Sequence, residues 1–240
     1  MVRELIVLGS ASQVPTRQRN HNGYLLRWDG EGTLFDPGEG TQRQFLLAGV
    51  SVSQVTRICI THFHGDHCLG LPGILQRMSL DGIARPVPVA FPASGSTYFE
   101  RLRHASIYDD RLSVVALPVS PPADGTLVTV PGAHGAEGSG TAAGTAVLYT
   151  AALRHSVDAV GWRVEEPAGR RMLPDRLAAA GVHGPDVARL QRDGAIVARG
   201  RRITLEEVSA ERRGQSVAVV MDTGWCEGAL ALARDVDLLV

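Results

Sequence analysis

The chain has 240 residues, of which 44% are hydrophobic and 20% charged, as is typical of a globular protein with a buried core. Its net charge of −1 excludes the strongly basic overall composition of many nucleic-acid-binding proteins, but not a local basic segment. Three cysteines at irregular spacing argue against a disulfide framework and for a reducing compartment. Because no apolar run approaches ~18 residues and no signal region is evident, we expect a cytoplasmic protein without a membrane span.

The first part of the chain predicts strands that alternate with turns and helices. Strands are expected over 5–8, 23–28, 33–36 and 57–60, and a helix over 41–48 that Gly49 ends. A cluster of histidines at 61–67 directly follows the last of these strands. Strands separated by helices favour an α/β arrangement, in which ligands bind beyond the carboxyl ends of the strands.

The middle of the chain continues the same alternation. Helices are expected over 69–79 and 95–103, and strands over 86–91, 112–117, 126–130, 147–154 and 160–165. The segment 132–144 is rich in Gly, Ala and Ser, and we expect it to be a mobile loop.

The composition changes over 167–213. This segment holds ten Arg and six acidic residues, a balance of +4, whereas the remainder holds fourteen Arg and nineteen acidic residues, a balance of −5. The segment contains two short helical patterns, over 174–180 and 185–192. After it we expect a strand over 216–221, a helix over 225–234 and a strand over 236–240. We therefore expect three segments: a core over 1–166, an inserted Arg-rich arm over 167–213, and the core resumed over 214–240.

The stretch Thr-His-Phe-His-Gly-Asp-His at 61–67 indicates a metal site, because histidine is the commonest metal ligand and neutral imidazole suits Zn²⁺. In an extended chain, residues two apart face the same side, so His62 and His64 can reach one ion. Asp66 and His67, on the turn beyond, then face a neighbouring site. The spacing differs from the i, i+4 histidine pair of helical zinc proteases.

Two later residues, His155 and Asp222, also end predicted strands. We predict one site from His62, His64 and His155, and a second to which Asp66 and His67 contribute, with Asp222 bridging the two. Paired ions about 3.5–4 Å apart stabilise both the attacking and the leaving oxygen of a phosphoryl displacement, and Asp66 is placed to accept the proton of the attacking water. Taken alone, His155 is better explained as a surface or core imidazole, and Asp222 is equally well explained as a turn or helix-capping residue.

The histidine stretch resembles the HxHxDH signature of the metallo-β-lactamase superfamily. Further segments, in collinear order, resemble the ribonuclease Z family of tRNA 3′-processing endonucleases. These segments are residues 15–20, 36–44, 69–73 and 155–162 and the Gly184-Pro185 pair of the arm.

The resemblance implies an αββα sandwich, a homodimer, and two zinc ions per subunit, with Mn²⁺ as the alternative metal. It implies that a tRNA precursor is cut just 3′ of the discriminator nucleotide, which leaves a 3′-hydroxyl. By position it assigns metal binding to His62, His64, Asp66, His67, His155 and Asp222, with Asp66 as the catalytic proton acceptor.

The RNA-binding residues are expected in two places. Arg170 and Arg171 of the arm suit backbone phosphates, and recognition of tRNA by shape fits such contacts. The resemblance adds Arg17, Arg19 and Asn20 and the Gly184-Pro185 pair. No aromatic residues alternate with the Arg residues of the arm, which argues against base stacking there.

One departure from the family concerns the C-terminal region. The family continues past the strand that matches 236–240 and supplies a His–Glu stretch and a further histidine ligand, whereas no histidine follows His183 here. We therefore expect the sequence to be incomplete after Val240. The sandwich would then lack its last strands and helix, the second metal site would be one ligand short, and the 240 residues alone would have impaired activity.

Two other hypotheses remain open at this point. The chain is alternatively another hydrolase of the superfamily that acts on small esters, which would need a closed apolar pocket and no basic arm. A non-catalytic homologue would bind tRNA without cleaving it. On composition alone, the arm is also explained as a solvated loop.

Overall fold

The computed structural model describes residues 2–130 and 146–240, and its contacts divide the chain into two compact units. The first comprises Met1–Gly140, Val147–Val164 and Ser216–Val240, and the second Thr141–Ala146 and Glu165–Gln215. The expected mobile loop over 132–144 lies outside the described residues.

The first unit is built on a six-stranded sheet with the order β1-β2-β3-β4-β5-β6. Its strands are β1 (Arg3–Gly9), β2 (Gly23–Trp28), β3 (Glu31–Phe35), β4 (Arg57–Cys59), β5 (Val87–Pro92) and β6 (Val114–Val119). The first three strands pair antiparallel, and β3 to β6 pair parallel. Because β3 and β4 run parallel in adjacent positions, the residues that follow Phe35 and Cys59 emerge at the same edge of the sheet.

Helices cover one face of this sheet. They are α1 (Thr41–Leu47), α3 (Leu71–Leu80) and α4 (Ser96–Arg103), accompanied by the short α2 (Gly65–Cys68) and the 3₁₀ turns η1 (Val52–Gln54) and η2 (Ala93–Gly95). Along α3, Leu71, Ile74, Leu75 and Met78 recur at helical spacing and are buried in one cluster with strand residues such as Ile58. Removing this apolar surface from water, at about 25 cal/mol per Å², is the main stabilising contribution to the unit.

The second sheet of this unit has five strands in the order β15-β14-β9-β8-β7. They are β7 (Val128–Thr129), β8 (Val147–Leu153), β9 (Ala159–Glu165), β14 (Ser216–Val219) and β15 (Leu238–Leu239). Helix α7 (Glu227–Ala233) packs on this sheet through Leu232, which is buried with Ala151 and Ala218. Arg163 of β9 holds the end of α7, since its guanidinium donates to the carbonyls of Leu232 and Arg234 at 3.2 and 2.7 Å.

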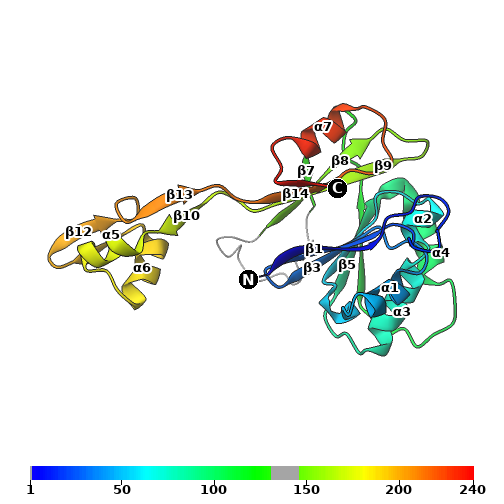
Figure 1. Cartoon of the computed structure of the whole chain (residues 1–240), viewed down its shortest axis with the longest axis horizontal. Coiled ribbons are helices and arrows are strands. Elements are labelled where there is room, and N and C mark those ends of the chain that lie inside the picture. The colour runs from blue at the N-terminus through cyan, green and yellow to red at the C-terminus, as the bar shows by residue number, and fades with distance from the viewer. Residues whose placement is uncertain (1, 131–145) are drawn as a thin grey trace. The chain divides into compact units, whose positions relative to one another are not determined.

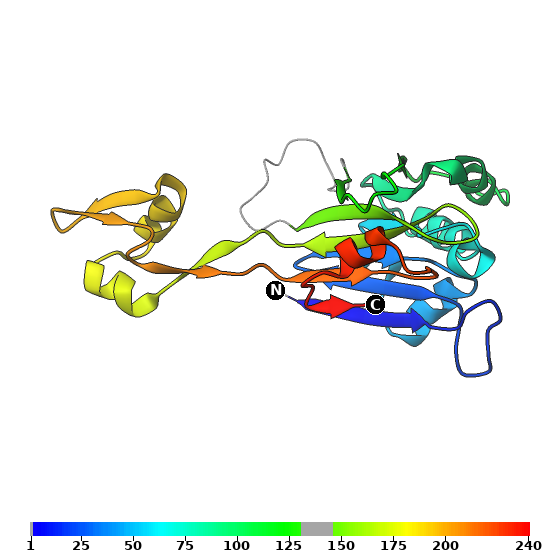
Figure 2. The same ribbon diagram turned by 90° about the horizontal axis from the view of Figure 1, so that it is seen from above.

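The layers of the first unit follow one another as helices, sheet, sheet and helix. Figure 1 shows α1 and α3 beneath the first sheet and α7 above the second. The turned view looks onto α7, with the strands β8, β9 and β14 of the second sheet behind it (Figure 2). The expected αββα sandwich is therefore confirmed.

The second unit contains more regular structure than its sequence predicts. Its helices, α5 (Pro174–Ala180) and α6 (Pro185–Asp193), match the two expected patterns. In addition, β10 (Gly169–Met172) pairs with β13 (Ser209–Arg212), and β11 (Ala195–Ala198) pairs with β12 (Arg201–Thr204), both antiparallel. Its own small core is formed by buried Val182, Leu190, Ile203 and Val208. Across the described residues of both units, no helix is both long and apolar enough to cross a membrane.

Candidate active site

The loop between β4 and α2 presents its side chains alternately to two sides. Phe63 packs against Phe91 and Tyr98, with ring centroids 5.8 and 6.0 Å apart. A Cβ atom at Gly95 would lie 2.0 Å from the Phe63 ring, so glycine is required for this packing. With Phe63 held in this way, His62 and His64 face the other side, as the two-residue period predicts.

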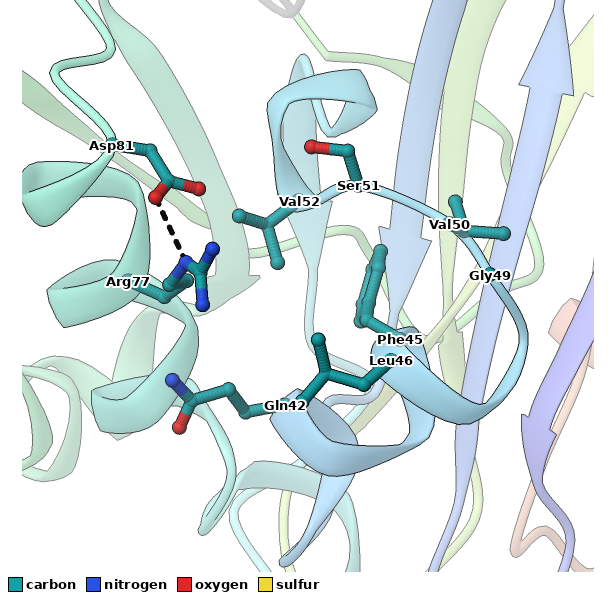
Figure 3. Close-up of a pocket in the computed structure, with 9 residues that line it drawn as sticks. All are labelled: Gln42, Phe45, Leu46, Gly49, Val50, Ser51, Val52, Arg77 and Asp81. Carbon is teal, nitrogen blue, oxygen red and sulfur yellow. Dashed lines mark hydrogen bonds and ion pairs between the residues drawn. The ribbon is translucent and has the colours of Figure 1, made fainter.

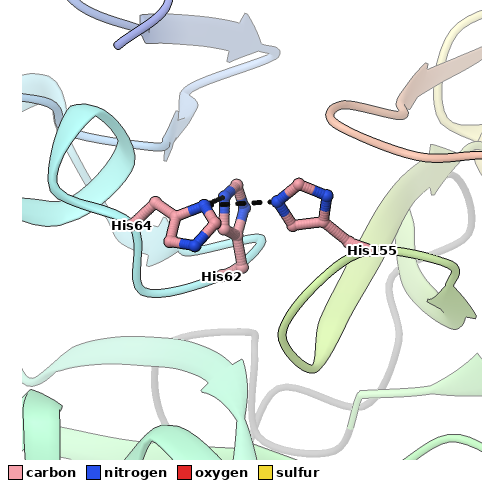
Figure 4. Close-up of side chains that lie close together, drawn as sticks. All are labelled: His62, His64 and His155. Carbon is pink, nitrogen blue, oxygen red and sulfur yellow. Dashed lines mark hydrogen bonds between the residues drawn. The ribbon is translucent and has the colours of Figure 1, made fainter.

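The first cluster consists of His62, His64 and His155, and its imidazoles converge (Figure 4). The Nδ1 atom of His64 lies 3.1 Å from Nε2 of His62 and 3.2 Å from Nε2 of His155. His155 comes from the loop after β8, in the second sheet, whereas the other two follow β4 in the first sheet. The fold thus brings together residues that lie 91 positions apart in the sequence.

The second cluster consists of His62, His67 and Asp222. The Oδ2 atom of Asp222 lies 3.4 Å from Nε2 of His67 and 3.9 Å from Nε2 of His62. Asp66 adjoins the cluster, since its Oδ2 is 3.5 Å from Nε2 of His67; this oxygen is buried and accepts no hydrogen bond from the described residues. All six residues predicted as metal ligands therefore lie in one place, and His62 belongs to both clusters.

Asp36 is a buried part of the site that was not among the residues predicted to form it. Its carboxylate accepts hydrogen bonds from the backbone N–H and the hydroxyl of Thr61, both at 2.6 Å, and lies 2.8 Å from Nδ1 of His67. It follows β3, while Thr61 follows the parallel neighbour β4. An acidic residue directly after a strand was the available signal, but the sequence did not show that this strand adjoins the one before the histidines.

Further polar contacts orient the imidazoles. The hydroxyl of Thr61 lies 3.0 Å from Nδ1 of His62, and Nδ2 of Asn22 lies 3.1 Å from Nε2 of His67. The Thr61 contact, like that of Asp36 with His67, is made to Nδ1, and contacts of this kind to the second ring nitrogen fix the orientation of a metal-binding imidazole. Asn22 instead lies against Nε2 of His67, the nitrogen that faces Asp222. Asn22 was likewise missed, because its loop carries no pattern that indicates a contact with His67.

The environment shifts the pKa values of two of the histidines in opposite directions. Burial, followed by the charge of His67, lowers the pKa of His62 to about 4. Burial also opposes protonation of His67, but the hydrogen bond with Asp36 and the nearby carboxylates outweigh it and raise the pKa of His67. At neutral pH His62 is therefore uncharged, which is the form that binds a metal ion.

The arrangement fits a zinc ion. Two nitrogens that bind one tetrahedral zinc at about 2.0–2.1 Å lie about 3.3–3.4 Å apart. The two nitrogen separations of the first cluster, 3.1 and 3.2 Å, are close to this spacing. Imidazole nitrogens together with carboxylate oxygens are the donor set that zinc takes in catalytic sites, and the unpartnered oxygen of Asp66 adds a further donor.

A hollow of about 420 Å³ lies beside the first cluster. It is lined by His155 and its neighbours 152–160 together with the residues at the ends of β5 and β6. Another, of about 290 Å³, lies between α1 and α3 and is lined by residues such as Phe45, Leu46 and Arg77 (Figure 3). None of the six candidate ligands lines that second hollow, whereas His155 lines the first.

The residues predicted to bind RNA lie in both units. In the first unit Arg17 and Arg19 are exposed, whereas Asn20 donates to the carbonyl of Glu39 at 2.7 Å and so also supports the neighbouring turn. In the second unit Arg171 and the Gly184-Pro185 pair are exposed, and Arg170 donates to the Ser209 hydroxyl at 2.7 Å. Their roles in RNA binding remain predictions.

Comparison with known proteins agrees with this fold and site. Residues 16–154 match the family model of the metallo-β-lactamase superfamily. The chain is 54% identical to the ribonuclease Z of Streptomyces coelicolor over 239 residues and 43% identical to that of Chlamydia caviae over 238, and in both cases it spans 73% of the relative's length. Among solved structures, human tRNase Z, short form, matches with a TM-score of 0.64 at 21% identity, over 98% of this chain and 75% of the other.

The fold and the histidine motif define a member of the metallo-β-lactamase superfamily. Within this superfamily the identities of 42 to 54% are decisive, and the chain belongs to the ribonuclease Z family. The expected family is thereby confirmed, as is its class of enzyme, an endoribonuclease.

Proposed function

We propose that the chain is a zinc-dependent endoribonuclease that removes the 3′ trailer from tRNA precursors, cutting just 3′ of the discriminator nucleotide. The convergence of His62, His64, His155, His67 and Asp222 in two adjoining clusters carries this proposal, together with membership of the ribonuclease Z family. By family membership alone, we further propose that it acts as a homodimer in the cytoplasm.

The proposed metal ligands are His62, His64 and His155 for one ion, and His67, Asp66 and Asp222 for the other. Zinc bound there would polarise the phosphodiester and lower the pKa of water toward neutrality. Asp36 holds His67 through Nδ1 and so leaves its Nε2 atom directed to the second cluster. We also assign to the Asp66 carboxylate, which has two oxygens, the proton of the attacking water; its Oδ2 atom is buried and has no hydrogen bond from the described residues.

The charge distribution supports an RNA substrate. The segment 167–213 carries a balance of +4 within a chain whose net charge is −1. Arg189, Arg192, Arg201 and Arg212 of this segment pair with carboxylates. Three of these carboxylates, those of Asp186, Asp193 and Glu207, lie in the segment and are already counted in its balance. We propose that Arg170 and Arg171, with Gly184-Pro185, bind tRNA phosphates, and that Arg17, Arg19 and Asn20 contact RNA near the cluster.

The proposal is tested by incubating the full-length protein with a tRNA precursor that carries a 3′ extension, with chelator, and after zinc or manganese is restored. We expect release of an intact trailer only in the presence of metal, and a mature 3′-hydroxyl end on the tRNA. His64→Ala should abolish release, while His104→Ala, an exposed histidine of the same unit, should release the trailer at the normal rate.

The proposal would be refuted if the protein released no trailer under any of these metal conditions. The arm separates the remaining alternatives. Deleting 167–213 should weaken cleavage of the tRNA precursor and leave hydrolysis of a small phosphodiester intact. A protein that binds the precursor tightly yet never cleaves it would instead be a non-catalytic tRNA-binding homologue.

A further inference from the structure

Trp225 is a large aromatic side chain that the fold leaves in water. It is 76% exposed, whereas the other two tryptophans of the chain, Trp28 and Trp162, are 6% and 0% exposed. It lies three residues beyond Asp222, in the segment that leads from β14 into α7. The indole of Trp225 is therefore accessible to a ligand, on a segment that follows a candidate metal ligand closely in the sequence.

The segment that carries Trp225 is held in a defined position. The N–H of Gly224 donates to the carbonyl of Arg154 at 2.8 Å, and the N–H of Arg154 donates to the hydroxyl of Thr223 at 3.1 Å. These contacts form an antiparallel bridge between the ends of β14 and β8. Figure 4 shows the chain after β14 passing beside the loop of His155. The two residues before Trp225 are thus bound to Arg154, which precedes a candidate metal ligand.

Arg154 supplies a positive charge at the same place. Its side chain is exposed and lies along Gly224, because a Cβ atom built on that glycine would be 3.6 Å from Cδ of Arg154. Among the described residues no carboxylate is paired with its guanidinium. Arg154 also lines the hollow of about 420 Å³ beside His155. The Arg154 guanidinium and the segment that carries Trp225 therefore lie on two adjoining loops beside His155.

We propose that Trp225 and Arg154 form a nucleotide subsite of the RNA substrate, in which the indole stacks on an unpaired base and the guanidinium binds an adjacent phosphate. The proposal rests on the proposed function, since it takes single-stranded RNA next to the cleaved bond as the ligand. Proteins read unpaired RNA by stacking bases on aromatic side chains, and arginine binds phosphate oxygens through its planar fork. The arm has no aromatic residues among its Arg residues, so it offers no stacking platform of its own.

The intrinsic fluorescence of the protein tests the subsite directly, because Trp225 is its one exposed tryptophan. A short single-stranded oligoribonucleotide is titrated into the full-length protein in the presence of chelator, so that no cleavage occurs. We expect quenching of the long-wavelength emission and protection of Trp225 from acrylamide. An abasic oligonucleotide of equal length and charge should cause neither effect. Trp225→Phe should retain only the emission of the two buried tryptophans, unchanged by RNA.

Binding of a labelled oligoribonucleotide, followed by anisotropy, measures the contribution of each side chain. Trp225→Ala should weaken binding about tenfold, and Trp225→Phe much less, because stacking requires only a ring. Arg154→Gln should weaken binding of the normal and the abasic oligonucleotide alike and lower the salt dependence. Leu80→Ala, which removes an 81% exposed side chain from the end of α3, should change nothing.

Three outcomes would overturn the subsite. RNA binding without any change in Trp225 emission would exclude stacking. Equal quenching by the abasic oligonucleotide would show that the effect comes from the charge of the RNA and not from its bases. Emission that depends on protein concentration and not on RNA would assign Trp225 to an interface with a second copy of the chain. None of these results affects trailer release by the unmodified protein, so failure of the subsite is distinguishable from failure of the proposed function.

Discussion

Two acidic residues of the site, Asp36 and Asp222, adopt the left-handed backbone conformation, with φ values of 45° and 44°. Residues other than glycine rarely adopt this conformation, and aspartate tolerates it better than most. Each follows a strand, and the left-handed turn ends the extended course of the chain there. Backbone strain of this kind persists where the surrounding structure determines the conformation, as at functional sites.

Replacing Asp36 tests how much the buried carboxylate contributes. Asp36→Asn keeps the size of the side chain but replaces one acceptor oxygen by an amide NH2 group, which donates, so that Thr61 or His67 loses its acceptor. We expect the free energy of unfolding to fall by about 3 kcal/mol and the metal affinity to fall about 10- to 100-fold. Urea unfolding and competitive metal titration measure the two effects. Asp81→Asn, which breaks a surface pair with Arg77, should cost less than about 1 kcal/mol.

The three cysteines should differ in reactivity. Burial raises the pKa of both Cys59 and Cys68 to about 12. For Cys226 burial also raises the pKa, but hydrogen bonds from the backbone of Ala229 and the hydroxyl of Thr223 outweigh it and lower the pKa. Because the thiolate is the reactive form, iodoacetamide should modify Cys226 first, at a rate that rises with pH through a midpoint below the ordinary thiol value.

Peptide mass spectrometry of the native protein, sampled over time at several pH values, measures this selectivity. In urea all three cysteines should react at similar rates, which controls for intrinsic reactivity. Modification of Cys68 as fast as Cys226 in the native protein would show that the region around α2 opens far more readily than its burial indicates.

At the scale of single elements, the contact between α7 and β8 shows how closely the second sheet is covered. A Cβ atom at Gly228 of α7 would lie 1.9 Å from the carbonyl oxygen of Ala152, a backbone atom that cannot move by itself. The same helix is held at its other end by Arg163. Since Trp225 and Asp222 lie just before α7, its position on the sheet also positions that part of the site.

Gly228→Ala should therefore displace α7 from the sheet. We expect a loss of about 3 kcal/mol in the free energy of unfolding, at the upper end of the range for overpacked positions, and weaker metal binding through Asp222. Gly73→Ala in α3 is a matched control, because its nearest neighbour is the movable end of Gln42 at 3.0 Å. That variant should stay within about 1 kcal/mol of the unmodified protein in urea unfolding.

At the scale of the whole molecule, the candidate ligands belong to one unit and the arm to another. All six ligands lie in the first unit, which has its own large core, while the second unit has a separate, smaller core around Leu190. A ligand that binds only the folded form stabilises the unit that contains its site. Metal binding should thus stabilise the first unit and leave the stability of the second unit unchanged.

Hydrogen exchange with and without zinc tests this expectation. Zinc should slow exchange around 58–68, 153–156 and 219–224, and a chelator should reverse the effect, whereas β10 and β13 of the second unit should exchange unchanged. His64→Ala should lose the zinc-induced protection, and His104→Ala should keep it. Equal protection of both units by zinc would contradict the assignment of the ligands to the first unit.

The sequence by itself determined the histidine motif, the family, and much of the local structure. Short-range patterns predicted the helices now seen as α1, α5 and α6, because helical periodicity and the glycines and prolines at helix ends act within a few residues. It also singled out all six candidate ligands, since His62, His64, Asp66 and His67 share one stretch and His155 and Asp222 each follow an apolar strand.

Only the tertiary structure decided which of these residues meet and what supports them. Strands β10 and β13 are polar and pair across about 40 residues, so no local pattern identified them. Asp36 and Asn22 became part of the site only when β3 and β4 were seen to be parallel neighbours and His67 was placed against both side chains. The approach of the segment that carries Trp225 to Arg154 likewise depends on a bridge between residues 154 and 224. Such contacts join residues that are far apart in the sequence, and the pattern of neighbouring residues does not specify which of them meet.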